Sequence, residues 1–225
     1  MKKLIIIGAG DFGREALWLA ERINEKFPTY HILGFVDDEK IGETVSGYPV
    51  LGSVDWLCKY SAPVSTVCAI ANGDVKASIF RAIEKNPQIT QVTLIDPTAI
   101  IGVTCKIGAG SIVCAGVVMT VDVAIGNGCI VNLNCTLGHD TVLRDFCTLH
   151  PGCNVSGKVT IGERVLIGTG SRIIQGISVA SNTIIGAGAV VIRDITESGT
   201  YVGVPAVRKC EDSLCNNCGN NSGVL

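Results

Sequence analysis

The chain has 225 residues and a formal net charge of -2, with 18 Lys and Arg against 20 Asp and Glu. This balance gives no electrostatic reason to expect a nucleic acid or an anionic membrane surface as a partner. The apolar run at residues 4–7 ends at Gly8, and no stretch approaches the ~20 apolar residues that a membrane-spanning helix needs, so we expect no signal peptide, no membrane span and a cytoplasmic location.

Residues 1–90 alternate between strand and helix signals. The apolar run at 3–7 predicts a buried parallel strand, and Gly-Ala-Gly-Asp-Phe-Gly at 8–13 predicts a tight turn into a helix over 14–24. Further strands are expected at 32–36, 64–71 and 91–94, with a helix at about 74–85. This order predicts a Rossmann-like α/β domain over residues 1–90, a small parallel sheet with helices on both faces.

The glycine motif at 8–13 has three interpretations. It could be a dinucleotide fingerprint, with Asp37 or Asp38 holding ribose hydroxyls, but about 90 residues provide only one mononucleotide half. A single nucleotide fits better, with its diphosphate on the backbone N–H groups at the helix start and its base or sugar on Asp37 and Asp38. Glycines that merely allow close packing are the third interpretation.

From Ile95 to Val191 every sixth residue is aliphatic, over seventeen consecutive positions. Neither a helix, with a period of 3.6, nor a flat strand, with a period of 2, keeps a strict period of six on one face. The residue four places later is almost always small or β-branched, and Gly often follows the aliphatic residue, where a bend needs freedom from a β-carbon. The pattern predicts a parallel β-helix over residues 91–209, with both kinds of residue inside.

The position of a cysteine in the repeat indicates its role better than the total of eleven does. Five of them occupy the inward small-residue position and are expected to be reduced and structural: Cys105, Cys129, Cys135, Cys147 and Cys153. Cys210, Cys215 and Cys218 belong to a polar tail, 210–225, which we expect to be flexible. The tail contains one C-x-x-C but no obvious fourth ligand, so no metal is expected.

Two histidines of the repeat region are candidate functional residues. His139 follows the inward Leu137 and Gly138, so it should lie on the outer surface near an edge of the β-helix, beside Asp140. His150 follows the inward Leu149 and should point elsewhere, because a three-sided coil repeats at eighteen residues and eleven separate the two histidines. A structural or substrate-side role is expected for His150.

Four segments together resemble the hexapeptide-repeat acyltransferases of the sialic acid O-acetyltransferase and nucleotide-aminosugar N-acetyltransferase type. They are residues 8–13, Phe35-Val36-Asp37-Asp38, the hexads with Gly138-His139-Asp140, and Val202-Gly203-Val204-Pro205-Ala206. The resemblance covers about residues 2–209. It implies a left-handed β-helix and a homotrimer, with acetyl-CoA as co-substrate in the cleft between neighbouring subunits and no metal.

The resemblance also implies roles for individual residues. His139 matches the family's general base, and Asp140 matches the acidic neighbour that raises its basicity. Backbone contacts to coenzyme A are expected at Gly157, Thr169 and Ala187. The nucleotide-sugar is expected at Gly10, Asp11, Phe12, Asp37 and Asp38.

The predicted activity is direct transfer of an acetyl group from acetyl-CoA to a 4-amino group of a nucleotide-linked sugar, with His139 taking the proton. One alternative is O-acetylation of a sialic acid-like sugar. Another, from a different class, is a non-catalytic trimeric scaffold whose first domain senses a nucleotide. An NAD-linked dehydrogenase would need a second nucleotide half that the sequence lacks.

Overall fold

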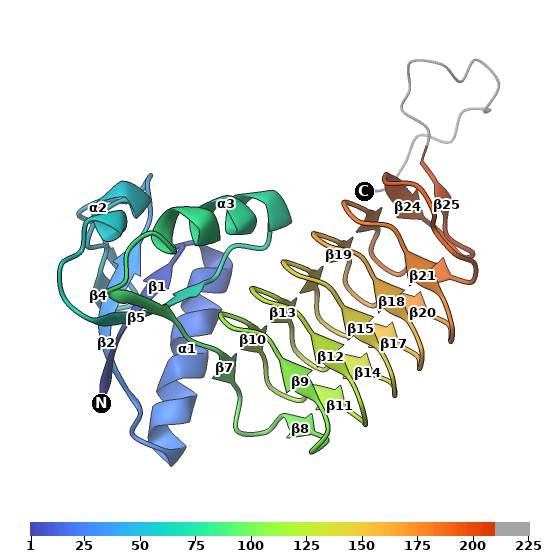
Figure 1. Cartoon of the computed structure of the whole chain (residues 1–225), viewed down its shortest axis with the longest axis horizontal. Coiled ribbons are helices and arrows are strands. Elements are labelled where there is room, and N and C mark those ends of the chain that lie inside the picture. The colour runs from blue at the N-terminus through green and yellow to red at the C-terminus, as the bar shows by residue number, and fades with distance from the viewer. Residues whose placement is uncertain (210–225) are drawn as a thin grey trace.

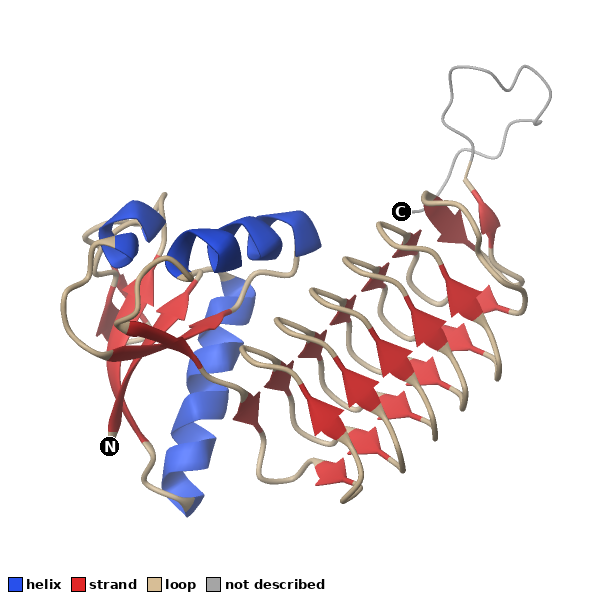
Figure 2. Ribbon diagram, viewed as in Figure 1, coloured by secondary structure: helices blue, strands red, loops and turns tan. Residues whose placement is uncertain are grey.

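The computed structural model describes residues 1–209 (Figure 1), so the tail expected at 210–225 lies outside the described residues. An α/β unit forms one end of the molecule, and a long ladder of short strands extends from it (Figure 2).

The α/β unit is built on a four-stranded parallel sheet in the order β2-β1-β5-β6. Leu4 and Ile6 of β1 pack against α1, whereas Ile5 and Ile7 pack against α2 and α3. Because side chains alternate across a strand, helices cover both faces, as predicted. The elements are β1 (Lys2–Ile7), α1 (Asp11–Lys26), β2 (Tyr30–Val36), β3 (Thr44–Val45), β4 (Tyr48–Pro49), α2 (Val54–Cys58), β5 (Val64–Cys68), α3 (Gly73–Ile83) and β6 (Ile89–Gln91).

The β3–β4 hairpin and helix α2 were not expected from the sequence. Ser53 caps the N-terminus of α2, since its side chain accepts a hydrogen bond from the Trp56 N–H at 3.1 Å. Asn72 caps α3 in the same way and accepts from the N–H groups of Asp74 and Val75.

Seventeen two-residue strands, β7 to β23, wind the chain into a three-sided prism. From β7 to β20, each strand pairs in parallel with the strand eighteen residues later, so three sheets form the sides. The first sheet holds β7 (Leu94–Ile95), β10 (Ile112–Val113), β13 (Ile130–Val131), β16 (Thr148–Leu149), β19 (Leu166–Ile167) and β22 (Ile184–Ile185), and is extended by β24 (Thr200–Val202) and β25 (Val207–Arg208). The second holds β8 (Ile100–Ile101), β11 (Val118–Met119), β14 (Thr136–Leu137), β17 (Asn154–Val155), β20 (Arg172–Ile173) and β23 (Val190–Val191). The third holds β9 (Lys106–Ile107), β12 (Ala124–Ile125), β15 (Val142–Leu143), β18 (Thr160–Ile161) and β21 (Ser178–Val179).

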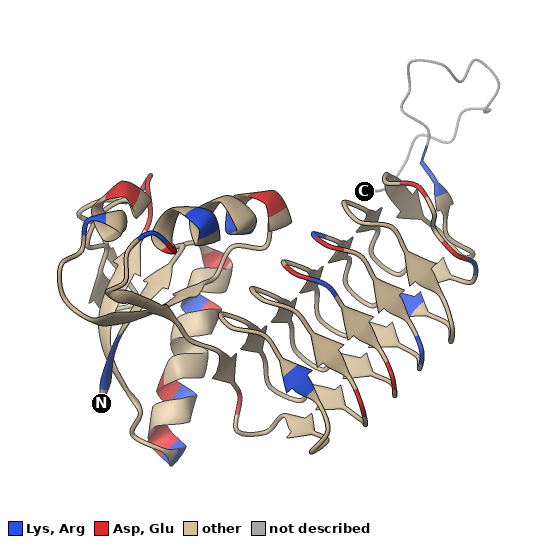
Figure 3. Cartoon of the chain, viewed as in Figure 1, with Lys and Arg blue, Asp and Glu red and all other residues tan. Residues whose placement is uncertain are grey.

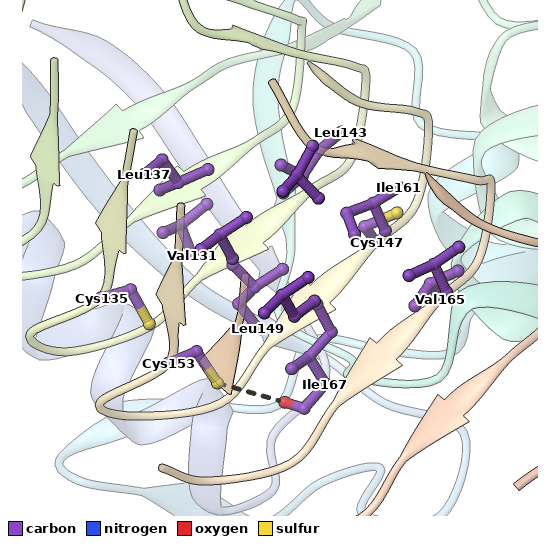
Figure 4. Close-up of a cluster of buried hydrophobic side chains, with 14 of the residues drawn as sticks. Val131, Cys135, Leu137, Leu143, Cys147, Leu149, Cys153, Ile161, Val165 and Ile167 are labelled. Carbon is purple, nitrogen blue, oxygen red and sulfur yellow. Dashed lines mark hydrogen bonds between the residues drawn. The ribbon is translucent and has the colours of Figure 1, made fainter. Parts of the chain in front are cut away.

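The predicted inward positions fill the prism. From Val113 to Val191, the aliphatic residue of every hexad is at most 4% exposed. Four of the five cysteines expected inside are fully buried, Cys105 is partly buried, and all five are free thiols. Figure 4 shows Cys135, Cys147 and Cys153 among the aliphatic side chains, where they act as small apolar residues.

The glycine after the inward aliphatic residue was expected to allow a bend, but the structure gives a different reason for it. The backbone of Gly138 is not left-handed, but a β-carbon there would lie 2.5 Å from the backbone nitrogen of Gly157 in the next coil. Close stacking of successive turns therefore selects glycine at this position. The left-handed residues come two positions later, for example at Asp140, with φ +60°.

The α/β unit packs on the outer surface of the first sheet. Leu94, Ile112 and Ile130 point outward from this sheet, yet they are at most 1% exposed because they join the cluster of β1 and α1. Ile100, which points outward from the second sheet, is 66% exposed. The first sheet is therefore the side of the prism that the α/β unit covers.

An ion pair joins the two parts at this interface. Arg22 of α1 donates from Nε to Asp96 Oδ2 at 2.7 Å, and the Asp96 side chain is fully buried. Burial opposes the ionisation of Asp96, but hydrogen bonds from Arg22 and Thr98 outweigh it and hold the pKa of this carboxyl below its ordinary value.

Candidate active site

His139 lies in the turn after β14, at the edge between the second and third sheets. Leu137 points into the prism and Gly138 packs on the next coil, so His139 is left outside with 45% of its side chain exposed. Val103 and Val121 occupy the equivalent positions of the two preceding coils, and Gly157 that of the following coil. We call this column of four residues the His139 edge.

The imidazole of His139 is oriented by its neighbour. Its Nδ1 lies 2.8 Å from Oδ2 of Asp140, whose left-handed backbone lets the carboxylate turn back on the preceding side chain. In the tautomer that donates Nδ1–H to Asp140, Nε2 carries the lone pair. No residue within 1–209 hydrogen bonds to Nε2, so this atom is available to accept a proton.

Gly157 allows this arrangement. A β-carbon on Gly157 would overlap Nε2 of His139, so the ring occupies space that only glycine leaves open. The structure thus brings together three of the residues that the sequence singled out, His139, Asp140 and Gly157.

Thr169 and Ala187 lie on a different edge. They stack one coil apart between the first and second sheets, where the Gly188 N–H donates to the Thr169 carbonyl at 2.8 Å. The second sheet, with Asn154 and Arg172 pointing outward, separates them from the His139 edge. The three residues expected at coenzyme A therefore border one side of the prism along its two edges.

Asp37 and Asp38 follow β2 at the carboxyl edge of the α/β sheet. Asp37 accepts hydrogen bonds from the backbone N–H groups of Ala9 and Glu39, at 2.8 and 3.0 Å. Asp38 accepts one from the Val54 N–H at the start of α2, at 2.8 Å. Both carboxylates therefore hold the loops around the glycine turn in place.

The glycines of the turn differ in their surroundings. A β-carbon on Gly13 would overlap the Gly8 carbonyl oxygen, so close packing explains this glycine. A β-carbon on Gly10 would meet nothing within 4 Å. Packing alone does not explain Gly10, which leaves the start of α1 open to an approaching ligand.

A cavity of about 550 Å³ opens at the carboxyl ends of β1, β2 and β5, between α2 and α3. This is the point where the strand order reverses, the usual ligand site of open α/β sheets. Its lining combines apolar walls with carboxylates: Val36, Val54, Ile70, Val75, Ile79 and Ala82 with Asp37, Asp38, Glu39 and Asp55. Because the sequence predicts a nucleotide at Asp37 and Asp38, we call it the nucleotide cavity.

Asp11 and Phe12 do not line the nucleotide cavity. They border a second crevice of about 250 Å³, which lies between α1 and the prism and is also lined by Glu15, Ala71, Ile130, Asn132, Thr148, His150 and Pro151. Sequence reasoning missed Glu15, although its place four residues after Asp11 puts both on one face of the helix. His150 also lines this crevice, and burial lowers the pKa of its imidazole.

Within one chain, the nucleotide cavity and the His139 edge lie on opposite sides of the prism. In a three-sided prism, the edge between the second and third sheets is opposite the first sheet, and the first sheet carries the α/β unit. A single chain therefore does not bring His139 to the residues expected to bind the nucleotide-sugar.

Lys76 of α3 is fully buried, which nothing in the sequence indicated, because lysine in an amphipathic helix normally lies on the solvent face. Its Nζ donates to Thr148 Oγ1 at 2.8 Å and to the Cys147 carbonyl at 3.2 Å. Thr148 in turn donates to the Ala71 carbonyl at 2.8 Å. Burial lowers the pKa of Lys76 to about 8.

Within residues 1–209, no group of three or more His, Cys, Asp or Glu side chains is placed to hold a metal ion. No helix within residues 1–209 combines the length and the hydropathy that a membrane-spanning segment requires. In Figure 3 the charged residues of the prism are sparse and of both signs.

Known proteins share this two-part architecture. Residues 3–83 match the family described as the PglD N-terminal domain. The acetyltransferase domain of PglB from Neisseria gonorrhoeae is 33% identical, with a TM-score of 0.86 over 93% of this chain and 100% of that one. A comparison with curated proteins gave no match.

Two further solved structures are similar over almost the whole chain. A variant of perosamine N-acetyltransferase from Caulobacter crescentus, in complex with CoA and GDP-perosamine, is 29% identical, with a TM-score of 0.84 over 94% of this chain and 98% of that one. WeeI from Acinetobacter baumannii is 29% identical, with a TM-score of 0.84 over 93% and 100%. These likenesses confirm the predicted fold class, an α/β domain followed by a left-handed parallel β-helix.

Proposed function

The chain belongs to the hexapeptide-repeat sugar acetyltransferases, and from that membership we propose that it transfers the acetyl group of acetyl-CoA to the 4-amino group of a nucleotide-linked sugar. The observation that carries the proposal is the pairing of His139 with Asp140 on the outer edge of the prism, with Nε2 unoccupied. Acetyl-CoA is the co-substrate, as in the complex of the related PglB domain.

The chemistry requires a base and no covalent intermediate on the enzyme. The amine attacks the thioester carbonyl carbon, a C–N bond forms, and Nε2 of His139 takes the amine proton. Asp140 stabilises the imidazolium that results. The C–S bond then breaks, and the thiolate of coenzyme A leaves with the proton from His139. Direct transfer fits the burial of the cysteines inside the prism, where they cannot act as acyl carriers.

Gly157, Thr169 and Ala187 are proposed to contact coenzyme A through their backbones. They border the second sheet on its two edges. An extended pantetheine chain on this side of the prism would bring its thioester to His139.

The nucleotide cavity is proposed to hold the base of the acceptor. Its apolar walls suit a flat ring, and Asp37 and Asp38 are hydrogen-bond acceptors for ring or ribose donors. The diphosphate would lie over Gly10 at the start of α1, where backbone N–H groups point outward. Lys40, whose Nζ lies 3.0 Å from the Ala9 carbonyl, supplies positive charge beside this position.

A homotrimer is proposed to complete the site. His139 is opposite the sheet that carries the α/β unit, so the base and the acceptor must come from different copies. Val103 and Val121, 102% and 53% exposed on the His139 edge, offer apolar surface for such a contact. The eight free thiols within residues 1–209 fit a reducing, cytoplasmic location.

The negative charges around the proposed acceptor site favour an aminosugar over a sialic acid-like sugar. The nucleotide cavity is lined by four carboxylates, and the crevice beside α1 by Asp11 and Glu15. Asp11 is paired with Arg14 at 2.7 Å, so Glu15 is the unpaired carboxylate of the crevice among the residues described, and it repels the carboxylate of a sugar acid and attracts an amine that still carries its proton.

The test is a panel of UDP-, dTDP- and GDP-linked 4-aminosugars and a sialic acid, each with acetyl-CoA and assayed by release of free thiol. We expect turnover with at least one aminosugar, and a loss of ~10²- to 10⁴-fold in His139→Ala with the assembly intact. Turnover of the sialic acid alone would establish the O-acetyltransferase instead. Failure to bind acetyl-CoA would favour the scaffold.

A further inference from the structure

Lys76 of α3 is buried where the α/β unit meets the prism, and the proposed reaction does not use it. Resting on the proposed function, we propose that Lys76 is a positioning residue for the nucleotide-linked acceptor. Through Thr148 it fixes the loop between β5 and α3, residues 69–72, which borders the acceptor site, and the diphosphate of the bound acceptor balances its buried charge.

Two hydrogen bonds connect Lys76 to the 69–72 loop. Its Nζ donates to Thr148 Oγ1 at 2.8 Å, and Thr148 Oγ1 donates to the Ala71 carbonyl, also at 2.8 Å. The hydroxyl is used once as acceptor and once as donor, so Thr148 and Ala71 are fixed together. A further bond from Nζ, to the Cys147 carbonyl at 3.2 Å, anchors the lysine on the prism.

The 69–72 loop borders both parts of the acceptor site. Ile70 lines the nucleotide cavity, whereas Ala71 and Thr148 line the crevice beside α1. Ile70 also packs on the glycine turn, because its Cγ1 lies 3.0 Å from the position that a β-carbon on Gly8 would take. A shift of this loop would therefore disturb the turn over which the diphosphate is proposed to lie.

The ammonium group of Lys76 has no carboxylate partner within residues 1–209. The titratable side chains that face it are thiols, those of Cys68 in β5 and of Cys129 and Cys147 in the prism. Burial lowers the pKa of Lys76 to about 8 and raises that of Cys68 to about 11, so the Cys68 thiol is neutral where the lysine titrates. An apolar side chain would fill this space without the cost of burying a charge, which indicates that the ammonium group is used.

The proposed acceptor supplies the missing negative charge. Both phosphates of a nucleotide-sugar are anionic, and their proposed place over Gly10 adjoins the loop that Lys76 holds. Charges separated by protein atoms interact more strongly than charges separated by water. Binding should therefore raise the pKa of Lys76, and the protein should take up a proton near pH 8.

Calorimetry with two kinds of ligand tests the positioning role. UDP, dTDP and GDP are titrated into wild type, and the tightest of them is compared with acetyl-CoA in Lys76→Met and in the control Lys85→Met, which alters an exposed lysine beyond the end of α3. We expect Lys76→Met to weaken the diphosphate about three- to tenfold, the value of one hydrogen bond, and to leave acetyl-CoA unchanged. Lys85→Met should change neither affinity.

A proton count tests the role of the charge. At pH 8, titrations in two buffers of different ionisation enthalpy give the number of protons taken up with the diphosphate. Wild type should take up as much as about half a proton more than Lys76→Met, because the free protein has Lys76 about half protonated at this pH.

Thr148 provides a second pair of variants that leaves Lys76 in place. Thr148→Val keeps the shape of the side chain but removes both hydrogen bonds of the hydroxyl, so it should weaken the diphosphate as Lys76→Met does. Thr148→Ser keeps the hydroxyl and should bind like wild type. A missing contact to the sugar cannot produce this difference, since the diphosphate probe carries no acceptor sugar.

Unchanged diphosphate affinity in Lys76→Met and Thr148→Val, equal weakening of acetyl-CoA, or an equal proton count in wild type and Lys76→Met would overturn the role of Lys76. These measurements do not depend on turnover. If wild type binds a diphosphate but acetylates no aminosugar, the proposed function fails while the affinities still decide the role of Lys76. A wild type that binds none of the three diphosphates would overturn both.

Discussion

The imidazole of His139 lies over the α-carbon of Gly157, in space that a β-carbon on Gly157 would occupy. The two residues are eighteen positions apart and adjacent on the His139 edge. The position of the candidate base therefore depends on a glycine in the next coil as well as on Asp140 beside it.

Gly157→Ala should displace the imidazole without unfolding the prism, because the new methyl group meets the end of a side chain and not the backbone. A displacement of about 1 Å at a reacting group costs on the order of 10²-fold in rate, so we expect kcat to fall by about that factor. Thiol release measures kcat, and thermal unfolding checks the fold.

The matched control for this variant is Gly47→Asn, in the turn of the β3–β4 hairpin. It places a side chain in open space at a left-handed position that asparagine tolerates. Equal activity losses in the two variants would mean that Gly157 has no particular relation to His139.

Asp140→Asn should lower kcat by between about tenfold and 10⁴-fold, because the amide can no longer stabilise the imidazolium. Asparagine is preferred to alanine for this test, since it accepts the left-handed backbone of residue 140. The pH dependence of kcat/KM reports the base directly. A variant with the rate and pH profile of the wild type would show that Asp140 only shapes the turn.

A site shared between copies predicts complementation between two inactive variants. Ser78→Trp would fill the nucleotide cavity, which Ser78 lines, and His139→Ala would remove the base. If base and acceptor come from different copies, trimers assembled from equal amounts of the two chains should recover about a quarter of the wild-type activity. No recovery, with mixed trimers demonstrated by differential tagging, would place the whole site within one chain.

Because of Lys76, the stability of the protein should increase as the pH rises through the alkaline range. Its folded pKa is about 8, below the ordinary value of 10.5, so the unfolded chain binds more protons between these two values. The free energy of unfolding should therefore rise with pH across this window, by up to about 3 kcal/mol.

Lys76→Met isolates this contribution from other titrating groups. The difference between wild type and variant in urea unfolding, measured at pH 7 and at pH 10, should move in favour of the wild type as the pH rises. A difference that is the same at both pH values would mean that Lys76 keeps its ordinary pKa in the folded protein.

The repeat region was the most predictable part of the chain. A row of side chains inside a three-sided coil must be aliphatic at every turn, so the period of six specified the sides, the inward residues and the burial of Cys135 or Cys153. The same phase put His139 outside at an edge. These features depend only on the geometry of one coil and the next, which the sequence repeats seventeen times.

No local sequence pattern predicts that the α/β unit packs on the first sheet. This packing determines where the remaining functional and buried polar residues lie. It buries Lys76 against Thr148, brings His150 opposite Asp11 and Glu15, and leaves His139 on the opposite edge. The sequence shows which side of each strand is apolar, but the outward residues of the first sheet are apolar like the inward ones, apart from Thr148. Only the tertiary structure shows that Leu94, Ile112 and Ile130 are covered by α1, because that contact joins residues more than seventy positions apart.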